Sequence, residues 1–384
     1  MISSQNAVRL AGRWLKQSGI QHKNGGVAAW YEADTGLYPF LYSEITGYAI
    51  STYLFLNTVR RDPQAIRAAH RAASWLIRSA AAPKGGVKTR LYLVKNYESP
   101  NYSFHRGRVY AFDTAMAGYG LTQLAAHSGN KEYLEAAGAL LRFLMKRMVR
   151  PDGTFWAYLD PRTGRCGEEP DKWSDQSGSF HAKLALFLLD YARTAGDPEV
   201  RRSALQLLNR AASAQETNGR FVTATADKST HLHPHAYTLE GLIYGAWHLR
   251  NDRFLHAALK GFEWMLRAVS DDGSVACLFV RNRFTHHERS DIVAQLLRVG
   301  SMLYAIYPAR MRRHLDILER VKRHLMLFQY RGDGQAGGFI YGSATDGLLR
   351  FHFNAWASMF ALQALWMHDA FVLRREPLRT DPFI

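Results

Sequence analysis

The chain is poor in cysteine and shows none of the compositional extremes of fibrous or disordered proteins. Cys166 and Cys277 are the only cysteines among 384 residues, too few for a disulfide framework or a multi-cysteine zinc site. This scarcity fits a reducing compartment. Hydrophobic residues make up 47% of the chain and charged residues 21%, close to an average globular protein, which excludes wholesale disorder and a collagen-like fibre. The composition therefore predicts a protein that can bury a large core.

Long apolar runs are also missing. The longest charge-free stretches, near 45–59 and 114–130, are shorter than the roughly 20 apolar residues that span a bilayer. Near the N-terminus, Arg9, Arg13 and Lys16 interrupt the apolar residues, so this segment lacks the continuous apolar core of a signal peptide. We expect no transmembrane segment and a cytoplasmic location.

Positive charge, by contrast, is abundant. Lysine and arginine number 49 and aspartate and glutamate 33, which gives a formal net charge of +16. A field of this sign attracts polyanions. The basic residues are spread over many segments rather than gathered in one arm, and no nucleic-acid-binding motif is present. Charge alone therefore leaves an acidic oligosaccharide or polysaccharide, a nucleotide-sugar and an anionic lipid surface as candidate partners, and we expect no nucleic acid.

An internal repeat organises the chain. A glycine-centred turn recurs with steps of 60, 68, 66, 54 and 61 residues between the glycines, so that six units nearly fill the sequence. The turns lie at Asn24-Gly25-Gly26, Lys84-Gly85-Gly86, Asp152-Gly153, Asn218-Gly219, Asp272-Gly273 and Asp333-Gly334. A fixed period of this kind indicates one supersecondary unit repeated along the chain.

Each repeat predicts two helices of different character. An amphipathic segment with a charged face precedes each turn, at 8–17, 66–79, 133–149, 200–214, 254–269 and 314–329. A segment almost free of charge follows each turn, at 45–59, 114–126, 182–189, 237–249, 292–306 and 354–367. A helix that is apolar on every side is buried on every side, so the charge-poor helices are expected inside and the amphipathic helices outside.

This alternation predicts an all-α fold. We expect an (α/α)6 toroid of six helical hairpins, with about twelve helices in inner and outer rings and minor β-hairpins in the long loops. A single domain would then cover residues 1–384. An open helical solenoid used for protein binding is the alternative.

The links between the helices differ in length at the two ends of the hairpins. Links from inner to outer helix are short and carry good helix-start residues, at Asp62-Pro63, Asn130, Asp197-Pro198 and Asn251. Links from outer to inner helix are long and rich in Trp, Tyr, Gly and charge. In a closed ring, all six long loops therefore gather on one face, over the N-terminal ends of the inner helices.

One polar cluster stands at the start of each inner helix. The clusters are Tyr42-Ser43-Glu44 with Thr46; Tyr110 and Asp113-Thr114; Asp175-Gln176 with His181; His231, His233, His235, Tyr237 and Glu240; Ser290-Asp291 with Gln295; and His352 with Asn354. A closed ring would turn them toward one central funnel. Trp356 and other aromatic residues near this face could stack on flat faces of a ligand.

Acidic residues recur in these clusters. Glu44, Asp113, Asp175 and Asp291 occupy equivalent places, and each has two interpretations, as an N-cap or first-turn acid or as a catalytic carboxylate. Glu240 lies one turn inside an apolar segment, where a carboxylate needs a partner or holds a proton. It is expected either to line the cavity or to serve as a hydrogen-bond hub.

The most unusual stretch is His231-Leu232-His233-Pro234-His235. Alternating imidazoles on one side of an extended segment could bind zinc or act as acid and base, whereas a proline-bent loop would give them ordinary hydrogen bonds. Neither cysteine nor an HExxH helix accompanies them, so we predict no metal and no cofactor. In the fifth long loop, Arg281 and the run His286-His287-Glu288-Arg289 could hold an anionic substrate.

Two other enzyme classes are disfavoured by the motifs. The glycine-rich turns lack the GxxxxGK[ST] order and the strand-to-helix context of a phosphate loop. The GxSxG motif of α/β-hydrolases does not occur.

With six helical hairpins expected, the sequence resembles the (α/α)6-barrel proteins of carbohydrate metabolism. The segment Tyr42-Ser43-Glu44-Ile45-Thr46-Gly47-Tyr48 is similar to the Y-P-E-[VI]-T-G-Y segment of a bacterial family found with polysaccharide biosynthesis genes, with Ser43 in place of proline. Asp113-Thr114 and the segments 235–241 and 353–356 are similar to its later repeats. The resemblance implies a carbohydrate substrate but no particular reaction, because similar toroids serve glycoside hydrolases, uronyl hydrolases, lyases and epimerases.

Three functional hypotheses follow. The first is an enzyme that hydrolyses a glycosidic bond in an anionic bacterial surface glycan by paired carboxylates, drawn from Glu44, Asp113, Asp175 and Glu240, with Glu44 and Asp113 the favoured pair. The second is a uronyl epimerase or lyase, in which His235, Tyr237, His181 and Arg281 would remove the proton next to a carboxylate and neutralise the charge. The third is a non-catalytic glycan-binding or scaffold protein that assembles with other polysaccharide-assembly proteins. The residues predicted to contact substrate are Tyr42, Tyr110, His181, His231, His233, Tyr237, Arg281, Asp291, Asn354 and Trp356.

Overall fold

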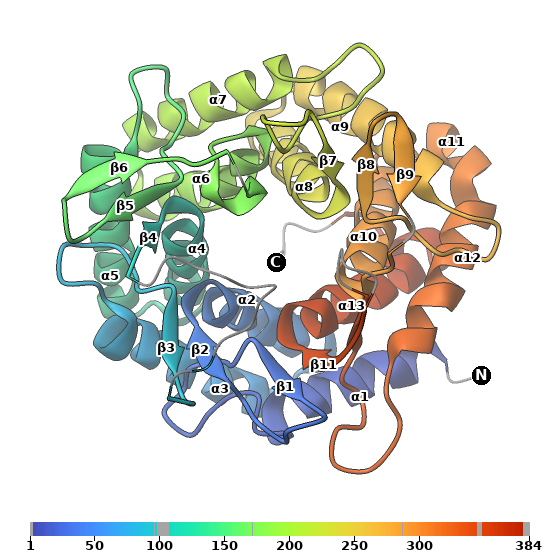
Figure 1. Ribbon diagram of the computed structural model, residues 1–384, viewed down its shortest axis with the longest axis horizontal. Helices are drawn as coiled ribbons and strands as arrows, with labels where there is room; N and C mark the ends of the chain where they lie inside the picture. The colour runs from blue at the N-terminus through green and yellow to red at the C-terminus, as the bar shows by residue number, and fades with distance from the viewer. Residues whose placement is uncertain are drawn as a thin grey trace.

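The helices form two concentric rings (Figure 1). The computed structural model describes residues 3–95, 97, 107–170, 172–285, 287–343 and 348–378. The inner helices are α2 (Ser43–Arg60), α4 (Ala111–Ser128), α6 (Leu184–Ala195), α8 (Leu232–Leu249), α10 (Ser290–Ile306) and α13 (Ala355–Met367). The outer helices are α1 (Ser4–Gln17), α3 (Pro63–Trp75), α5 (Lys131–Phe143), α7 (Pro198–Ser213), α9 (Asp252–Met265) and α12 (Leu315–Leu325), with the short α11 (Pro308–Met311) before the last. The prediction of an (α/α)6 toroid is confirmed.

The ring is closed, so the alternative of an open solenoid is wrong. Helix α13 packs against α1 and α2, which brings the last hairpin beside the first. Strand β1 (Trp30–Glu32) also pairs antiparallel with β11 (Leu349–Asn354), with Trp30 opposite Asn354. Residues more than 300 positions apart in the chain are thereby joined in one sheet.

Burial follows the charge pattern of the sequence. Every residue of α2 from 43 to 56 is buried, as expected of a helix that touches neighbours on all sides. Helix α12 buries only Leu318, Val321 and Leu325, which recur at helical spacing on one face. The outer helices begin as predicted, because Asp62, Asn130, Asp197 and Asn251 accept hydrogen bonds from backbone N–H groups of the first turn.

Two predicted boundaries need correction. Helix α8 begins at Leu232 rather than at 237, so His233 and His235 lie in its first turn and not in an extended segment or a loop. Pro234 is compatible with this position because the first-turn N–H groups have no partner within the helix. The third inner helix begins with a 3₁₀ turn, Ser179–Lys183, before α6.

Small sheets join the long loops above the inner ring, on the face toward the viewer in Figure 1. Three hairpins lie within single long loops, in agreement with the expectation of minor β-hairpins there. They are β5–β6 (Tyr158–Asp160, Arg165–Gly167), β8–β9 (Leu278–Val280, Arg283–Thr285) and β10–β11 (β10, Ile340–Ser343). The others pair loops of neighbouring repeats: β2 (Phe40–Tyr42) with β3 (Arg90–Tyr92), β4 (Val109–Tyr110) with β5, and β7 (Thr230–His231) with β8.

Four of these strands end directly at an inner helix. Tyr42, Tyr110, His231 and Asn354 are the last residues of β2, β4, β7 and β11, and the next residue begins α2, α4, α8 and α13. The strand pairing therefore fixes the side chain that enters each helix. This arrangement places equivalent residues of different repeats on the same face of the ring.

The repeated glycine turn has a packing role. Gly25 has φ +104°, and a Cβ atom there would lie 2.2 Å from the carbonyl oxygen of Arg71 in the next outer helix. Gly337 has φ +101°, and its Cβ would lie 2.2 Å from the oxygen of Leu10. Only glycine fits both the backbone conformation and the contact. The sixth structural turn is therefore at Gly337 and not at Gly334, where a Cβ would meet nothing within 4 Å.

No helix within the described ranges is long and apolar enough to cross a membrane.

Candidate active site

A cavity of about 530 Å³ opens among the long loops over the inner helices, within the volume range of ligand pockets. All six repeats contribute to its wall. The charged and aromatic lining residues are Tyr42, Glu44, Tyr110, Phe112, Asp113, Lys172, Trp173, Phe180, Asp227, His231, His233, Tyr237, Arg289, Tyr341, Arg350 and Trp356. Apolar rings with a few charged groups suit a ligand that has both flat apolar faces and polar edges.

Eight of the predicted site residues share this cavity. They are Tyr42, Glu44, Tyr110, Asp113, His231, His233, Tyr237 and Trp356. Asp175 and Asp291 do not line the cavity but bond residues that do, and Glu240 lies one layer further away, bonded to Lys183 and Arg298. Asp175 accepts a hydrogen bond from the Tyr110 hydroxyl at 2.7 Å, and Asp291 accepts one from Trp356 Nε1 at 2.9 Å.

Glu44 and Asp113 are both buried in the cavity wall. Neither caps its helix, because the N-cap residues are Tyr42 and Tyr110 and neither of these makes a side-chain cap. Glu44 and Asp113 are therefore not N-caps, but both lie in the first turn of their helices, as the alternative of first-turn acids predicted. This position also places them in the cavity wall.

Burial raises the pKa of both carboxyl groups, but by different amounts. For Glu44, the Tyr42 hydroxyl and the positive charge of Lys183 oppose the effect of burial, and its pKa is moderately raised. For Asp113, burial and then the negative charge of Glu44 raise the pKa well above the usual range. The Asp113 Oδ2 atom also makes no hydrogen bond within the described residues. Because the charge of Glu44 opposes ionisation of Asp113 in a buried wall, the pair favours one protonated and one ionised carboxyl group.

His233 forms a second polar centre in the same wall. Its Nδ1 atom lies 2.7 Å from Gln295 Oε1 and 3.2 Å from Asp291 Oδ2. Because both neighbours are acceptors in this arrangement, Nδ1 carries the proton and Nε2 keeps its lone pair. Burial lowers the pKa of His233 to about 4, so the ring is neutral near pH 7.

Asp291 is held in its ionised form by its neighbours. Burial opposes ionisation, but the Arg289 guanidinium, together with His233 and Trp356, outweighs it and lowers the pKa of Asp291. Arg289 Nε and Nη2 lie 3.1 and 2.6 Å from the two carboxylate oxygens, a forked pair. Arg289 also lines the cavity, whereas His286 of the same predicted run lies outside the described residues.

Glu240 is the hydrogen-bond hub of a buried charged layer. It accepts hydrogen bonds from Lys183 Nζ at 2.7 Å and from Arg298. Burial alone would raise the pKa of Glu240, but Arg298 and Lys183 together lower it. Lys183 Nζ also lies 4.1 Å from the centre of the Tyr237 ring, and Tyr237 lines the cavity. The charged layer of Lys183, Glu240 and Arg298 thus packs against the cavity wall through Tyr237.

Four residues predicted to act at the site lie elsewhere, and these predictions are corrected. His235 follows His233 by two residues on the same helix, which turns its side chain by about 200° away from the cavity. Its Nδ1 atom accepts a hydrogen bond from Phe221 N, and its Nε2 atom lies 3.1 Å from the backbone oxygen of Gly261. His181 is buried in the 3₁₀ turn against Phe180. Asn354 caps α13 by accepting from Ala357 N at 3.0 Å. Arg281 is exposed in the β8–β9 turn.

Sequence reasoning missed several residues of this region. Lys172, Tyr341 and Arg350 line the cavity, but Lys172 lies in a loop and Tyr341 and Arg350 lie in strands β10 and β11, where no helical periodicity marks them. Lys183 and Arg298 were detectable, because each is a basic residue within a predicted charge-poor segment. Such a residue is the natural partner for the equally isolated Glu240.

The fold is shared with known proteins although the sequence is distant from them. No protein-family model and no curated protein sequence matches the chain. Among solved structures, the chain is similar to cellobiose 2-epimerase from Bacillus thermoamylovorans B4167, with TM-score 0.76 and 13% identity over 94% of this chain and 98% of that chain. Cellobiose 2-epimerase from Spirochaeta thermophila DSM 6192 gives TM-score 0.76 and 17% identity over 96% and 98%.

A second group of similar structures has a different named activity. Unsaturated glucuronyl hydrolase from Bacillus sp. GL1 gives TM-score 0.68 and 16% identity over 97% of each chain. Its structure is described as that of an enzyme responsible for the degradation of glycosaminoglycan. At these identities the likeness establishes the toroid fold.

Proposed function

We propose that this protein is a carbohydrate-active enzyme that hydrolyses a glycosidic bond in an anionic glycan, with Asp113 as general acid and Glu44 as the second carboxylate. The observation that carries the proposal is the presence of two buried carboxyl groups in one cavity wall, where burial raises the pKa of both and the charge of Glu44 raises that of Asp113 further. Glycoside hydrolysis requires such a pair, one protonated and one ionised.

The two roles follow from the surroundings of each group. Asp113 keeps its proton because ionisation would add a second negative charge beside Glu44 in a buried wall. It can donate that proton to the leaving oxygen. Glu44 has the Lys183 charge nearby, which favours its ionised form, and it can activate water or attack the anomeric carbon.

The cavity wall supports an anionic sugar as substrate. Lys172, Arg289 and Arg350 bring positive charge to it, and the net charge of +16 attracts polyanions from a distance. Trp173 and Tyr341 offer rings on which a sugar face can stack. The resemblance of the segment 42–48 to proteins found with polysaccharide biosynthesis genes, and the likeness to glucuronyl hydrolases, agree with this class.

The test uses Asp113→Asn and Glu44→Gln, assayed on uronic-acid-containing oligosaccharides by release of reducing ends. Each substitution removes one proton-transfer group or nucleophile and should lower kcat by about 10²–10⁴-fold. Substrate binding, measured by calorimetry, should persist. Asp316→Asn, at an exposed position on outer helix α12, is the matched control. Full activity in both cavity variants would refute the assignment.

Epimerisation is the second candidate, and His233 is the observation that favours it. A neutral imidazole backed by Gln295 and Asp291 can remove a proton from a carbon next to a carbonyl through Nε2. The similar cellobiose 2-epimerases agree with this reaction class. Incorporation of solvent deuterium into the sugar without bond cleavage, lost in His233→Gln but retained in Asp113→Asn, would establish it instead of hydrolysis.

A non-catalytic glycan-binding protein is the remaining outcome of the same assays. It would bind the oligosaccharides without turnover or deuterium incorporation, and Glu44→Gln would bind them equally well.

A further inference from the structure

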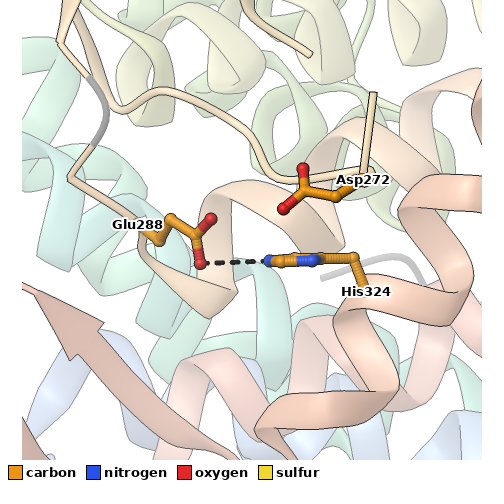
Figure 2. Close-up of side chains that lie close together, drawn as sticks. All are labelled: Asp272, Glu288 and His324. Carbon is orange, nitrogen blue, oxygen red and sulfur yellow. Dashed lines mark hydrogen bonds and ion pairs between the residues drawn. The ribbon is translucent and has the colours of Figure 1, made fainter. Parts of the chain in front are cut away.

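Three side chains of metal-ligating type lie close together at the outer ring (Figure 2). Asp272 lies in the glycine turn that follows α9, Glu288 lies between β9 and α10, and His324 lies in the last turn of α12. One donor atom of each side chain lies within 4.8 Å of the other two. His324 Nε2 is 3.0 Å from Glu288 Oε2. The residues come from three separate segments that only the fold brings together.

We propose that Asp272, Glu288 and His324 form a binding site for a divalent transition-metal cation such as Zn²⁺ or Mn²⁺. Two carboxylate oxygens and one imidazole nitrogen suit these ions. An all-oxygen site, which Ca²⁺ prefers, is not offered by these three side chains. The site lies outside the cavity proposed as the active site and does not depend on the reaction assigned there.

The geometry needs side-chain movements of about an ångström. Metal–ligand bonds of about 2.0–2.2 Å in a tetrahedral site place donor atoms about 3.4 Å apart, whereas the three donor atoms here lie within 4.8 Å of one another. Asp272 is exposed, so water can enter and complete the coordination. Rotation of the carboxylate side chains can close the remaining distance.

The surroundings hold the three ligands in place. Asp272 Oδ1 accepts a hydrogen bond from Ser274 N at 2.9 Å, which orients the carboxylate. The backbone oxygen of Glu288 accepts one from Ser343 N at 2.7 Å. The ring of His324 packs edge-on against Phe328 at 5.7 Å, and its side chain is 10% exposed. Ordering these groups before binding lowers the entropy cost of coordination.

A cation here would tie the outer ring to the cavity wall. Glu288 directly precedes Arg289, which pairs with Asp291 and lines the cavity. Coordination would join this segment to α12 and to the turn after α9. Occupancy of the site is therefore expected to stabilise the folded chain, because the ion binds the folded state and not separate segments of the unfolded one.

The test titrates ZnCl₂ and MnCl₂ into tag-free, chelator-treated full-length protein. Calorimetry should give one ion per chain, and the thermal midpoint should rise with metal concentration. Removing one ligand should weaken binding by about 100-fold or more, since loss of mere supporting contacts already costs 10–100-fold. The variants are Asp272→Asn and His324→Gln. Asp271→Asn, the neighbouring exposed carboxylate, is the matched control and should bind like the wild type.

Three results would overturn the proposal. The first is the absence of heat and of a thermal shift at millimolar metal, which would leave the cluster as an ion pair between imidazolium and carboxylates. The second is equal loss in Asp271→Asn and Asp272→Asn. The third is binding that survives in His324→Gln but disappears in His287→Gln. Asp272 is exposed, so its variant keeps the test valid if His324→Gln fails to fold.

Discussion

Lys183 Nζ lies 2.7 Å from Glu240 Oε2, and the two side chains are 0% and 4% exposed. This ion pair joins two inner helical segments beneath the cavity and is completed by Arg298. The same ammonium group lies 4.1 Å from the centre of the Tyr237 ring and 4.7 Å from that of Tyr48. The charged layer therefore also contacts the rings of Tyr48 and Tyr237, whose hydroxyl groups lie beside Glu44.

Breaking the Lys183–Glu240 pair should strongly destabilise the protein. Glu240→Gln leaves two buried cations without their counter-charge, which costs about 3–5 kcal/mol. Urea unfolding of the variant measures this loss. Glu216→Gln removes the partner of Arg220 in a half-exposed i,i+4 pair and should cost less than about 1 kcal/mol. Equal losses of unfolding free energy in the two variants would show that the buried pair contributes no more to stability than the half-exposed pair.

The raised pKa of Asp113 should make stability fall as pH rises. The folded state retains the Asp113 proton above the unfolded value of about 3.9, so it binds more protons than the unfolded state in this interval. The free energy of unfolding then falls by about 1.4 kcal/mol for each pH unit between the two pKa values. Asp113→Asn should remove this slope and exceed the wild type in stability above the folded pKa. Chemical unfolding at a series of pH values measures it, and an unchanged slope would contradict the assignment.

Buried histidines should produce the opposite slope at acid pH. Burial lowers the pKa of His231, His233 and His235 to about 4 and that of His181 to about 3. The unfolded state takes up these protons below about pH 6.5 while the folded state does not. Stability therefore falls as pH decreases from about 6.5 to 4, by about 1.4 kcal/mol per pH unit for each imidazole.

His235→Gln tests this prediction away from the cavity. The substitution should reduce the dependence of the unfolding free energy on pH, between about pH 6.5 and 4, by the contribution of one imidazole. His127→Gln, at an exposed position, is the control for the substitution itself. A slope that stays the same in His235→Gln would mean that this imidazole is protonated in the folded state.

Gly337 of the sixth turn and the nearby Gly334 provide a matched pair. Gly337→Ala places a Cβ 2.2 Å from a backbone oxygen and should cost about 3 kcal/mol or more, because strain and a fixed clash add. Gly334→Ala has the same kind of φ, +77°, but open space around the Cβ, and should cost only about 1–2 kcal/mol. Thermal unfolding distinguishes them. Equal shifts would indicate that the contact with Leu10 relaxes freely.

Much of the fold was predictable because its signals are local. The charge-poor and amphipathic segments identified the inner and outer rings, and the Asp and Asn caps marked the starts of the outer helices. Hydrophobic periodicity and capping act within a few residues of the chain. The sequence also indicated that Glu240 needs a partner, since an isolated carboxylate in an apolar helix is costly.

The composition of the site was less accessible. His233 and His235 look equivalent in the sequence, yet one lines the cavity and the other faces outward, because the helix begins earlier than its apolar pattern. Arg281 and Arg289 belong to the same basic loop, but only Arg289 lines the cavity. There it forms an ion pair with Asp291.

The sequence by itself determined the period, the two classes of helix and the end of the ring at which polar residues gather. Only the tertiary structure decided which of those residues meet, that Glu44 and Asp113 share one buried wall, and that Asp272, Glu288 and His324 converge at the outer ring. The reason is that helix formation depends on neighbours along the chain, whereas the direction of each side chain into a shared space depends on helix phase and on packing between distant repeats.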